Sequence, residues 1–224
     1  MPLIAGIDEA GRGPVIGPLV LALVVAPEST IRTWHKIGVR DSKSLARETR
    51  ASLFNRITQE ASFWSAVSYP AWMIDRVNIT HLIQVVVQMW IQTYRPPHLI
   101  MDAMTVPEGI NAWIERIRKR LPDWNGNIIM QPSADARYPI VSAASIVAKH
   151  LRDEAMRFLK ETYAIPGWGY PSESAVIRFL EKWYKQSRRW PSWVRSRWQT
   201  CRRIQNRLES PLTSSSSPPF PGLS

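Results

Sequence analysis

The chain has 224 residues, of which 45% are hydrophobic and 21% charged, enough apolar material for a core and too little charge for wholesale disorder. This length fits one large domain or one domain with an appendage and excludes a small disulfide-stapled peptide. The net charge of +11, with +4 on residues 1–150 and +7 on residues 151–224, favours a polyanionic partner such as nucleic acid, although solubility alone would also explain it.

Apolar runs alternate with helical patterns along the first three quarters of the chain. In chain order, these patterns predict strands at 3–7 and 19–26, a helix at 44–60, a strand at 63–69, a helix at 71–94, a strand at 98–101, a helix at 107–121, a strand at 127–131 and a helix at 140–163. Strands that alternate with helices indicate an α/β protein built around a sheet.

The last quarter of the chain has a different pattern. Residues 172–208 are purely helical in pattern with a break at Pro191, and residues 178–207 contain ten Lys and Arg against one acid, Glu181. We expect these helices to contact a nucleic-acid backbone without reading its sequence. Residues 210–224 are Ser/Pro-rich and uncharged, so they cannot bury enough surface to offset the entropy of ordering. The predicted organisation is an α/β domain at 1–171, a helical extension packed on it at 172–209 and a disordered tail at 210–224.

Three features indicate a cytoplasmic protein with no membrane partner. The single cysteine, Cys201, excludes an internal disulfide and a cysteine-built zinc site, which suits a reducing compartment. The longest apolar stretch, residues 19–26, is far shorter than the ~20 residues that a membrane-spanning helix needs. Asp8, Glu9 and Arg12 interrupt the region where the apolar core of a signal peptide would lie.

Carboxylates follow two of the predicted strands. Asp8 and Glu9 close the first strand, Asp102 closes the strand at 98–101, and Asp135 lies in the loop after the fifth strand. Clustered acids raise one another's pKa, and a divalent cation would resolve this repulsion. Oxygen ligands without cysteine or paired histidine select Mg²⁺ or Mn²⁺, so the pattern indicates phosphodiester hydrolysis at two metal ions. The alternative is that these acids only cap helices or pair with arginines.

A glycine turn follows the first strand. Gly11 and Gly13 flank Arg12 and allow the backbone to approach a ligand closely with its N–H groups exposed. The turn lacks the Lys-Ser/Thr of a nucleotide-cradling loop and the spacing of a dinucleotide fingerprint. A simple tight turn between two strands is the alternative.

Five segments in order resemble one family. They are GIDEAGRGPVIGP from Gly6, RDSKSL from Arg40, MDAM from Met101, YPIVSAASIVAKHLRDEAM from Tyr138 and GWGYPS from Gly167. Together they resemble ribonuclease HII, and their sequences are most similar to those of archaeal-type members. The resemblance implies a ribonuclease H-like mixed β-sheet flanked by helices, with residues 1–171 as the catalytic domain and a C-terminal helical extension.

The resemblance also implies an activity. The family is expected to cut the phosphodiester 5′ to ribonucleotides in RNA/DNA hybrids and at single ribonucleotides embedded in duplex DNA. It implies two-metal-ion catalysis with Mg²⁺ or Mn²⁺, water as the nucleophile, and 3′-hydroxyl and 5′-phosphate ends. Matched residue by residue, the family's four metal-binding catalytic carboxylates fall on Asp8, Glu9, Asp102 and Asp135. The loop around Asp135 reads ADAR, where many relatives carry a second acid or a lysine-rich lead-in, a departure that would weaken metal binding.

Substrate contacts follow from the same match. The turn of Gly11, Arg12 and Gly13 matches the segment whose backbone senses the ribose 2′-hydroxyl. Tyr170 matches the tyrosine that packs at the RNA-to-DNA junction, although a loop aromatic pinned by Pro171 is the alternative. Further phosphate contacts are expected at Lys43 and along one face of the 140–163 helix, where a solvated flank is the alternative; this face carries Ser142, Ser145, Lys149 and Arg152.

Further expectations concern Asp153, the oligomeric state and the alternative functions. Asp153 is expected to pair with a neighbouring arginine rather than bind metal. The protein is expected to act as a monomer, and its uncharged tail contains no evident helical motif for contact with a sliding clamp. A catalytically idle hybrid-binding module is the rival from another class, but a pure binder gains nothing from burying acids near phosphates. A different nuclease on the same fold is disfavoured by Tyr170 and the glycine turn.

Overall fold

The computed structural model describes residues 2–39, 45–103 and 107–209. Its centre is a five-stranded mixed sheet with the strand order β3-β2-β1-β4-β5. β1 pairs in antiparallel fashion with β2, which pairs likewise with β3, whereas β1, β4 and β5 run parallel. The strands are β1 (Leu3–Ala10), β2 (Leu19–Pro27), β3 (Phe63–Tyr69), β4 (His98–Asp102) and β5 (Asn127–Gln131). The predicted α/β class is confirmed.

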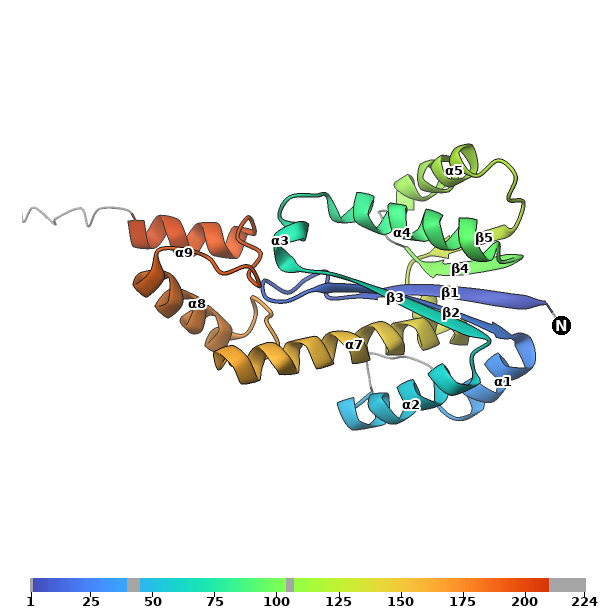
Figure 1. Cartoon of the computed structure of the whole chain (residues 1–224), viewed down its shortest axis with the longest axis horizontal. Helices are drawn as coiled ribbons and strands as arrows, with labels where there is room; N and C mark the ends of the chain where they lie inside the picture. Colours follow the sequence, from blue (N-terminus) through green and yellow to red (C-terminus); the bar gives the residue numbers. More distant parts are fainter. Residues whose placement is uncertain (1, 40–44, 104–106, 210–224) are drawn as a thin grey trace, which may run out of the picture.

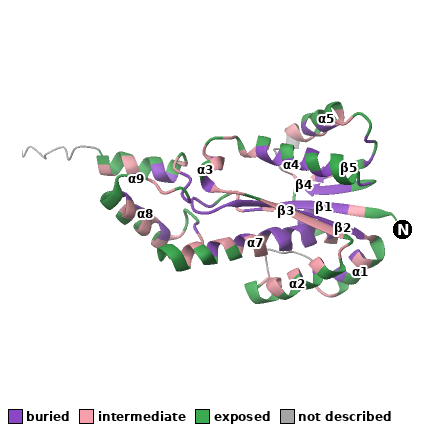
Figure 2. Ribbon diagram, in the orientation of Figure 1, coloured by how far each residue is buried: buried purple, intermediate pink, exposed green. Residues whose placement is uncertain are grey.

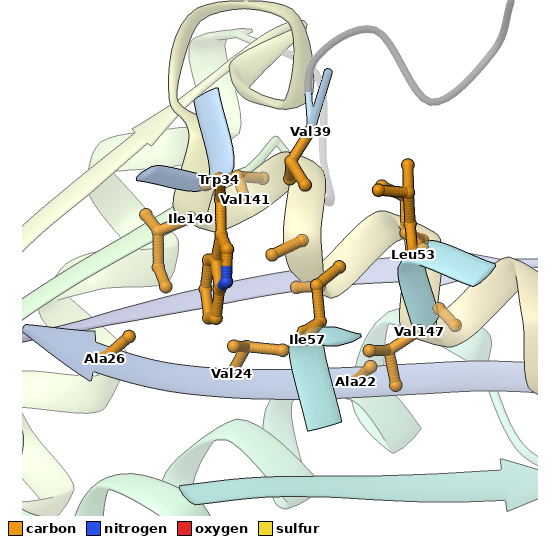
Figure 3. Close-up of a cluster of buried hydrophobic side chains, with 14 of the residues drawn as sticks. Ala22, Val24, Ala26, Trp34, Val39, Leu53, Ile57, Ile140, Val141 and Val147 are labelled. Carbon is orange, nitrogen blue, oxygen red and sulfur yellow. The ribbon is translucent and has the colours of Figure 1, made fainter. Parts of the chain in front are cut away.

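Helices cover both faces of the sheet (Figure 1). One face carries α4 (Ile79–Tyr94) and α5 (Ile110–Arg120); the other carries α1 (Glu28–Lys36), α2 (Arg47–Glu60) and α7 (Pro139–Tyr163). Strand β2 is buried along nearly its whole length because its alternate residues serve the two cores. Leu21 and Leu23 join the α4 core, whereas Ala22 and Val24 join the α7 core around Trp34 (Figure 3).

A third apolar cluster lies beyond the sheet. Helices α8 (Ser174–Ser187) and α9 (Gln199–Glu209) build it with residues of α7 and with Val15 and Ile16 (Figure 2). Trp193 is buried in it, with its ring centroid 5.1 Å from those of both Tyr163 and Trp183. The C-terminal helices therefore share a core with the segment that follows the glycine turn.

The helix prediction was wrong in two places. Helix α1 was not predicted, because its nine residues are largely polar and bury only Ile31 and Trp34. The predicted helix 71–94 is interrupted: α3 (Ala71–Ile74) stops before Asp75, and α4 begins after Asn78, whose side chain accepts the Thr80 N–H at 2.8 Å. An asparagine at this position caps a new helix and disfavours continuation of the old one.

The ends of two further predictions also differ. Strand β1 continues past the two acids because Glu9 and Ala10 pair with Leu21 and Val20 of β2. In the C-terminal region, residues 188–198 are not helical, so the break is wider than Pro191 alone. A short 3-10 helix (Pro107–Gly109) lies between β4 and α5.

The next expectations concern membrane-spanning helices, the single cysteine and the C-terminal tail. Within the described ranges, no helix combines the length and the apolar character needed to cross a membrane. Cys201 is a free, buried thiol in α9. The predicted tail, residues 210–224, lies outside the described residues.

Candidate active site

Carboxylates gather where β1 and β4 end. The two strands run parallel with Ile7 opposite Met101, so Asp8 and Asp102 follow at the same edge of the sheet. Asp8 is 5% exposed, and the side chain of Glu9 is 14% exposed. This edge therefore concentrates negative charge in a poorly solvated place.

The fourth acid, Asp135, lies on the short helix α6 (Ala134–Arg137) rather than in a loop. Ser133 turns the chain into this helix with a left-handed backbone (φ 58°). The Ala134 N–H donates to Asp102 Oδ1 at 2.9 Å, and the Ala103 N–H donates to the same oxygen at 3.1 Å. Asp102 thus attaches the turn that carries Asp135 to the end of β4, and Asp135 is itself buried.

Burial and mutual repulsion act on the two acids of β1. Desolvation, and then the charge of Glu9, raise the pKa of Asp8 well above its usual range, while a hydrogen bond from Ser145 opposes that rise. Desolvation raises the pKa of Glu9, whereas the Arg12 guanidinium, whose Nε donates to Glu9 Oε1 at 3.1 Å, acts to lower it. The charge of Asp102 raises the pKa of both acids. These three carboxylates are therefore close enough to repel one another.

The donor set of this edge suits a divalent cation. The four carboxylates supply only oxygen, the ligand type that Mg²⁺ and Mn²⁺ prefer, and Glu9 Oε2 is buried with no hydrogen-bond partner. Among the described residues, no three acidic, histidine or cysteine side chains stand close enough to hold one ion together. Mg²⁺ usually takes one or two protein carboxylates and completes its shell with water and substrate phosphate, so a pair of these acids would be enough to hold it.

A cavity of about 300 Å³ with a basic lining lies beside Glu9. Arg47 lies over the Trp168 ring, 3.6 Å from its centroid, in a cation–π contact. Asp153 pairs with Arg50 and, at 3.7 Å, with Arg47, which confirms its expected salt bridge. The basic and aromatic lining consists of Arg47, Arg50, Lys149, Arg152, Trp168 and Tyr170. Positive charge next to the acids suits a phosphate group.

The glycine turn contributes its first residue, Gly11, to the lining of this cavity. Gly11 has a φ of +98°, and a Cβ there would lie 2.4 Å from the Pro18 carbonyl oxygen and 2.6 Å from Arg152 Nε, so only glycine fits. A Cβ on Gly13 would lie 4.0 Å from Tyr170 Cε1, and Tyr170 is 40% exposed. The structure thus brings together the turn and the tyrosine that sequence analysis singled out.

The ribonuclease HII family profile matches residues 5–201, a span that contains the four acids, the glycine turn and Tyr170. The chain belongs to the ribonuclease HII family. Ribonuclease HII of Pyrococcus furiosus is 39% identical to it over 211 residues, which cover 92% of this chain and 93% of the relative.

Solved structures agree with this membership. The ribonuclease H2 of Pyrococcus horikoshii OT3 superposes with a TM-score of 0.83 at 35% identity, covering 93% of this chain and 99% of that one. The match in the PCNA:RNase HII complex from Archaeoglobus fulgidus has a TM-score of 0.74 at 32% identity, covering 88% and 95% of the two chains. The predicted ribonuclease H-like fold and the resemblance to archaeal ribonuclease HII are confirmed. Ribonucleases HII are hydrolytic, metal-dependent nucleases.

The predicted phosphate-binding face of α7 is only partly available in this ribonuclease HII fold. A contact of the Ser142 and Ser145 hydroxyls with a substrate phosphate stays a prediction, and both residues are fully buried in this structure. The cause is the close packing of the first half of α7 against the sheet. Lys149 and Arg152 do line the cavity. Lys43 lies outside the described residues.

Two residues that hold the ribonuclease HII site together, Glu173 and Arg195, were not predicted from the sequence. The Glu173 carboxylate accepts the N–H groups of Trp168 and Tyr170, each at 2.9 Å, and so holds the loop that carries the tyrosine. Arg195 contacts the glycine turn from the C-terminal region. Glu173 by itself resembles a helix-start acid, and nothing in the local sequence marks Arg195, which resembles its basic neighbours. The first positions of the GWGYPSE stretch were the available signal for Glu173, since paired glycines need a fixed loop.

Proposed function

We propose that this chain is an endoribonuclease that hydrolyses the phosphodiester 5′ to ribonucleotides, both in RNA/DNA hybrids and at single ribonucleotides embedded in duplex DNA. The products would carry 3′-hydroxyl and 5′-phosphate ends, and water would be the nucleophile. The observation that carries the proposal is the position of the acidic strand ends beside a basic cavity that is lined by Gly11 of the glycine turn and by Tyr170. Family membership supports the ribonuclease H reaction itself.

In this proposal the acids form the hydrolytic centre. Asp8 and Asp102 would hold Mg²⁺ or Mn²⁺, with Glu9 and Asp135 completing a two-ion site when substrate is bound. Bound there, the ions would activate the attacking water and stabilise the leaving oxygen. Ser145 would orient Asp8 through its hydrogen bond, together with the Glu9 N–H, which donates to Asp8 Oδ1 at 2.8 Å.

The glycine turn and Tyr170 would select the ribose. Backbone N–H groups of Gly11, Arg12 and Gly13 would bind the 2′-hydroxyl, the group that distinguishes RNA from DNA. The exposed ring of Tyr170, adjacent to Gly13, would pack against the sugar at the RNA-to-DNA junction. Selection of the cleavage site would then depend on the geometry of the RNA-to-DNA junction as well as on the ribose 2′-hydroxyl.

The remaining parts of the chain would grip the duplex. We propose residues 1–171 as the catalytic domain and residues 172–209 as a basic extension that contacts the nucleic-acid backbone, in a protein that acts as a monomer. A sliding-clamp contact is not part of the proposal, although the Archaeoglobus fulgidus relative was solved in complex with PCNA.

Cleavage of a labelled DNA duplex with one ribonucleotide tests this function. With Mg²⁺ or Mn²⁺ we expect a nick immediately 5′ to the ribonucleotide, and with chelator we expect none. Cleavage confined to long RNA/DNA hybrids would retain the hydrolytic centre and reject the roles of the glycine turn and Tyr170. Tight binding without any cut in either metal would reject the proposed activity in favour of an idle hybrid-binding module.

The Lys149→Ala variant should weaken substrate binding more than it slows the chemical step. Lys149 lines the basic cavity, so its loss should raise KM roughly five- to tenfold, equivalent to about 1 kcal/mol, with little change in kcat. The slope of log Kd against log salt should fall by about 1 if Lys149 binds a phosphate. Steady-state kinetics and a salt titration measure both effects.

Lys36→Ala is the matched control for Lys149→Ala. Lys36 ends α1, which begins after β2 residue Pro27, and Pro27 pairs with Leu3 at the opposite end of β1 from the acids. This control removes the same charge and should leave KM and the salt slope unchanged. Equal effects of the two variants would mean that only net charge matters.

A further inference from the structure

Arg195 is an arginine without solvent exposure, in the segment between α8 and α9. Its guanidinium donates to the Gly11 carbonyl at 2.5 Å, to the Arg12 carbonyl at 3.0 Å and to the Gly17 carbonyl at 3.1 and 3.2 Å. Three carbonyls of the segment from Gly11 to Gly17, two of them in the glycine turn, therefore converge on one side chain that lies more than 170 residues away in sequence.

The segment around Arg195 is itself held on both sides. The Arg195 N–H donates to the Val15 carbonyl at 2.9 Å, and the guanidinium lies 5.0 Å from the centroid of the Trp198 ring. Next to it, the N–H and hydroxyl of Ser196 donate to Asp75 at 2.6 and 2.7 Å. Desolvation, aided by the charge of Arg152, lowers the pKa of Arg195 to about 9, so the side chain stays protonated at neutral pH.

The hydrogen bonds to Arg195 fix the direction in which two backbone N–H groups of the turn point. The described peptide bonds are all trans, and in a planar trans peptide the C=O of one residue points opposite to the N–H of the next. Because Arg195 binds the Gly11 and Arg12 carbonyls from the buried side, the N–H groups of Arg12 and Gly13 point away from Arg195. These two N–H groups follow Gly11, which lines the cavity, and a Cβ on Gly13 would lie 4.0 Å from Cε1 of Tyr170, another lining residue.

We propose that Arg195 is a positioning residue that sets the direction of the Arg12 and Gly13 N–H groups toward the ribose of the substrate. This proposal rests on the proposed function, in which the turn senses the 2′-hydroxyl. Arg195 does not touch the substrate; it acts through the turn. A guanidinium suits this role because its fixed fork of donors serves several carbonyls at once, whereas an ammonium is a single point of charge.

The test compares Arg195→Gln with the matched control Arg118→Gln. Arg118 makes the same kind of contact elsewhere: it donates to the Trp124 carbonyl at 3.0 Å and the Gly126 carbonyl at 2.5 Å and lies 4.9 Å from the Trp124 ring centroid. Both variants remove one arginine that holds backbone carbonyls, and only Arg195 contacts the glycine turn. Thermal unfolding with and without Mn²⁺ checks that folding and the acidic site persist.

The substrates are two duplexes that differ at one sugar, a ribonucleotide or its 2′-deoxy-2′-fluoro analogue. For Arg195→Gln we expect kcat on the ribonucleotide duplex to fall about 100-fold, the size of effect that misplaced groups produce, with KM within about twofold. The rate ratio between the two duplexes should fall with kcat. Arg195→Lys should recover part of both, and Arg118→Gln should leave kcat and the ratio unchanged.

Any of the following results would overturn the proposal. A loss of activity with an unchanged rate ratio, or an equal loss in Arg118→Gln, would reduce Arg195 to a general structural role. Full activity of Arg195→Gln would reject any role. If the unaltered enzyme cleaves both duplexes equally, the proposed function fails with it, and this outcome is distinct because it precedes any substitution. If Arg195→Gln does not fold, the Arg195→Lys comparison decides by the same ratio.

Discussion

Asp8→Asn should reduce cleavage by about 10³-fold or more while leaving binding of the hybrid nearly unchanged. Loss of a carboxylate that holds a catalytic cation removes several kcal/mol of transition-state stabilisation, and each 1.36 kcal/mol corresponds to a factor of ten in rate. The asparagine is nearly isosteric and keeps the hydrogen bond with Ser145 possible. Single-turnover cleavage and a binding assay in Ca²⁺ or chelator separate the two effects.

The same variant should be more stable than the unaltered protein when no divalent cation is present. The pKa of Asp8 is raised in the folded state, so its contribution to stability is full at pH values below its unfolded pKa and is lost as the pH rises through the folded value. At neutral pH the unaltered chain therefore loses folding stability at Asp8, where folding must either desolvate the carboxylate or protonate it, and asparagine avoids this cost. We expect a higher Tm for Asp8→Asn at pH 7 in chelator and a smaller difference near pH 4.

The control for these measurements is Asp123→Asn, an exposed acid in the loop before β5. It should change neither cleavage nor the pH dependence of Tm. Mn²⁺ should raise the Tm of the unaltered protein and of Asp123→Asn more than that of Asp8→Asn, because only the latter lacks a ligand. Full turnover by Asp8→Asn, or an equal metal response, would remove Asp8 from the site.

Gly11→Ala should nearly abolish activity and lower stability. The alanine would meet a backbone oxygen, that of Pro18, at 2.4 Å, and Gly11 already has a φ of +98° that L side chains rarely adopt. Strain of this backbone kind costs about 1–3 kcal/mol, and displacement of the turn by about 1 Å would cost about 100-fold in rate. Thermal unfolding and cleavage of the single-ribonucleotide duplex measure the two losses.

Gly38→Ala separates backbone strain from steric overlap. Gly38 has a φ of +96°, almost that of Gly11, but nothing lies within 4 Å of a Cβ placed there. It should therefore lower Tm through strain alone and leave kcat unchanged. If Gly38→Ala and Gly11→Ala lose the same stability and Gly11→Ala keeps its activity, then the close packing of the turn has no role in catalysis.

Much of the sheet was predictable because its strands are short and mainly apolar. The strand at 63–69 has the predicted bounds, and β2 extends one residue beyond its prediction. The three acids at the ends of β1 and β4 were predictable because parallel strands end at the same edge. Helix α1 was not, since its buried face contains only two residues and tertiary packing, not periodicity, makes it a helix.

The supporting contacts of the site were not predictable for a different reason. Arg195 lies among basic residues, and counting charges assigns all of them to solvent or to nucleic acid. Its burial depends on a partner turn more than 170 residues away, which no local pattern records. The same holds for Ser142 and Ser145, whose helical spacing indicated a shared face but not whether that face meets solvent or the sheet.

The long separation between Arg195 and the glycine turn has a consequence for the order of assembly. Contacts between distant parts of a chain form late, because a large loop must close before they contribute. The sheet, its acids and the serine that bonds Asp8 lie within residues 3–145, whereas the turn receives its last restraint only from Arg195. On a ribosome, the hydrolytic centre would therefore be able to form before the ribose-sensing turn is held. We expect the growing chain to gain selectivity for ribonucleotides only after its final helices have emerged and packed.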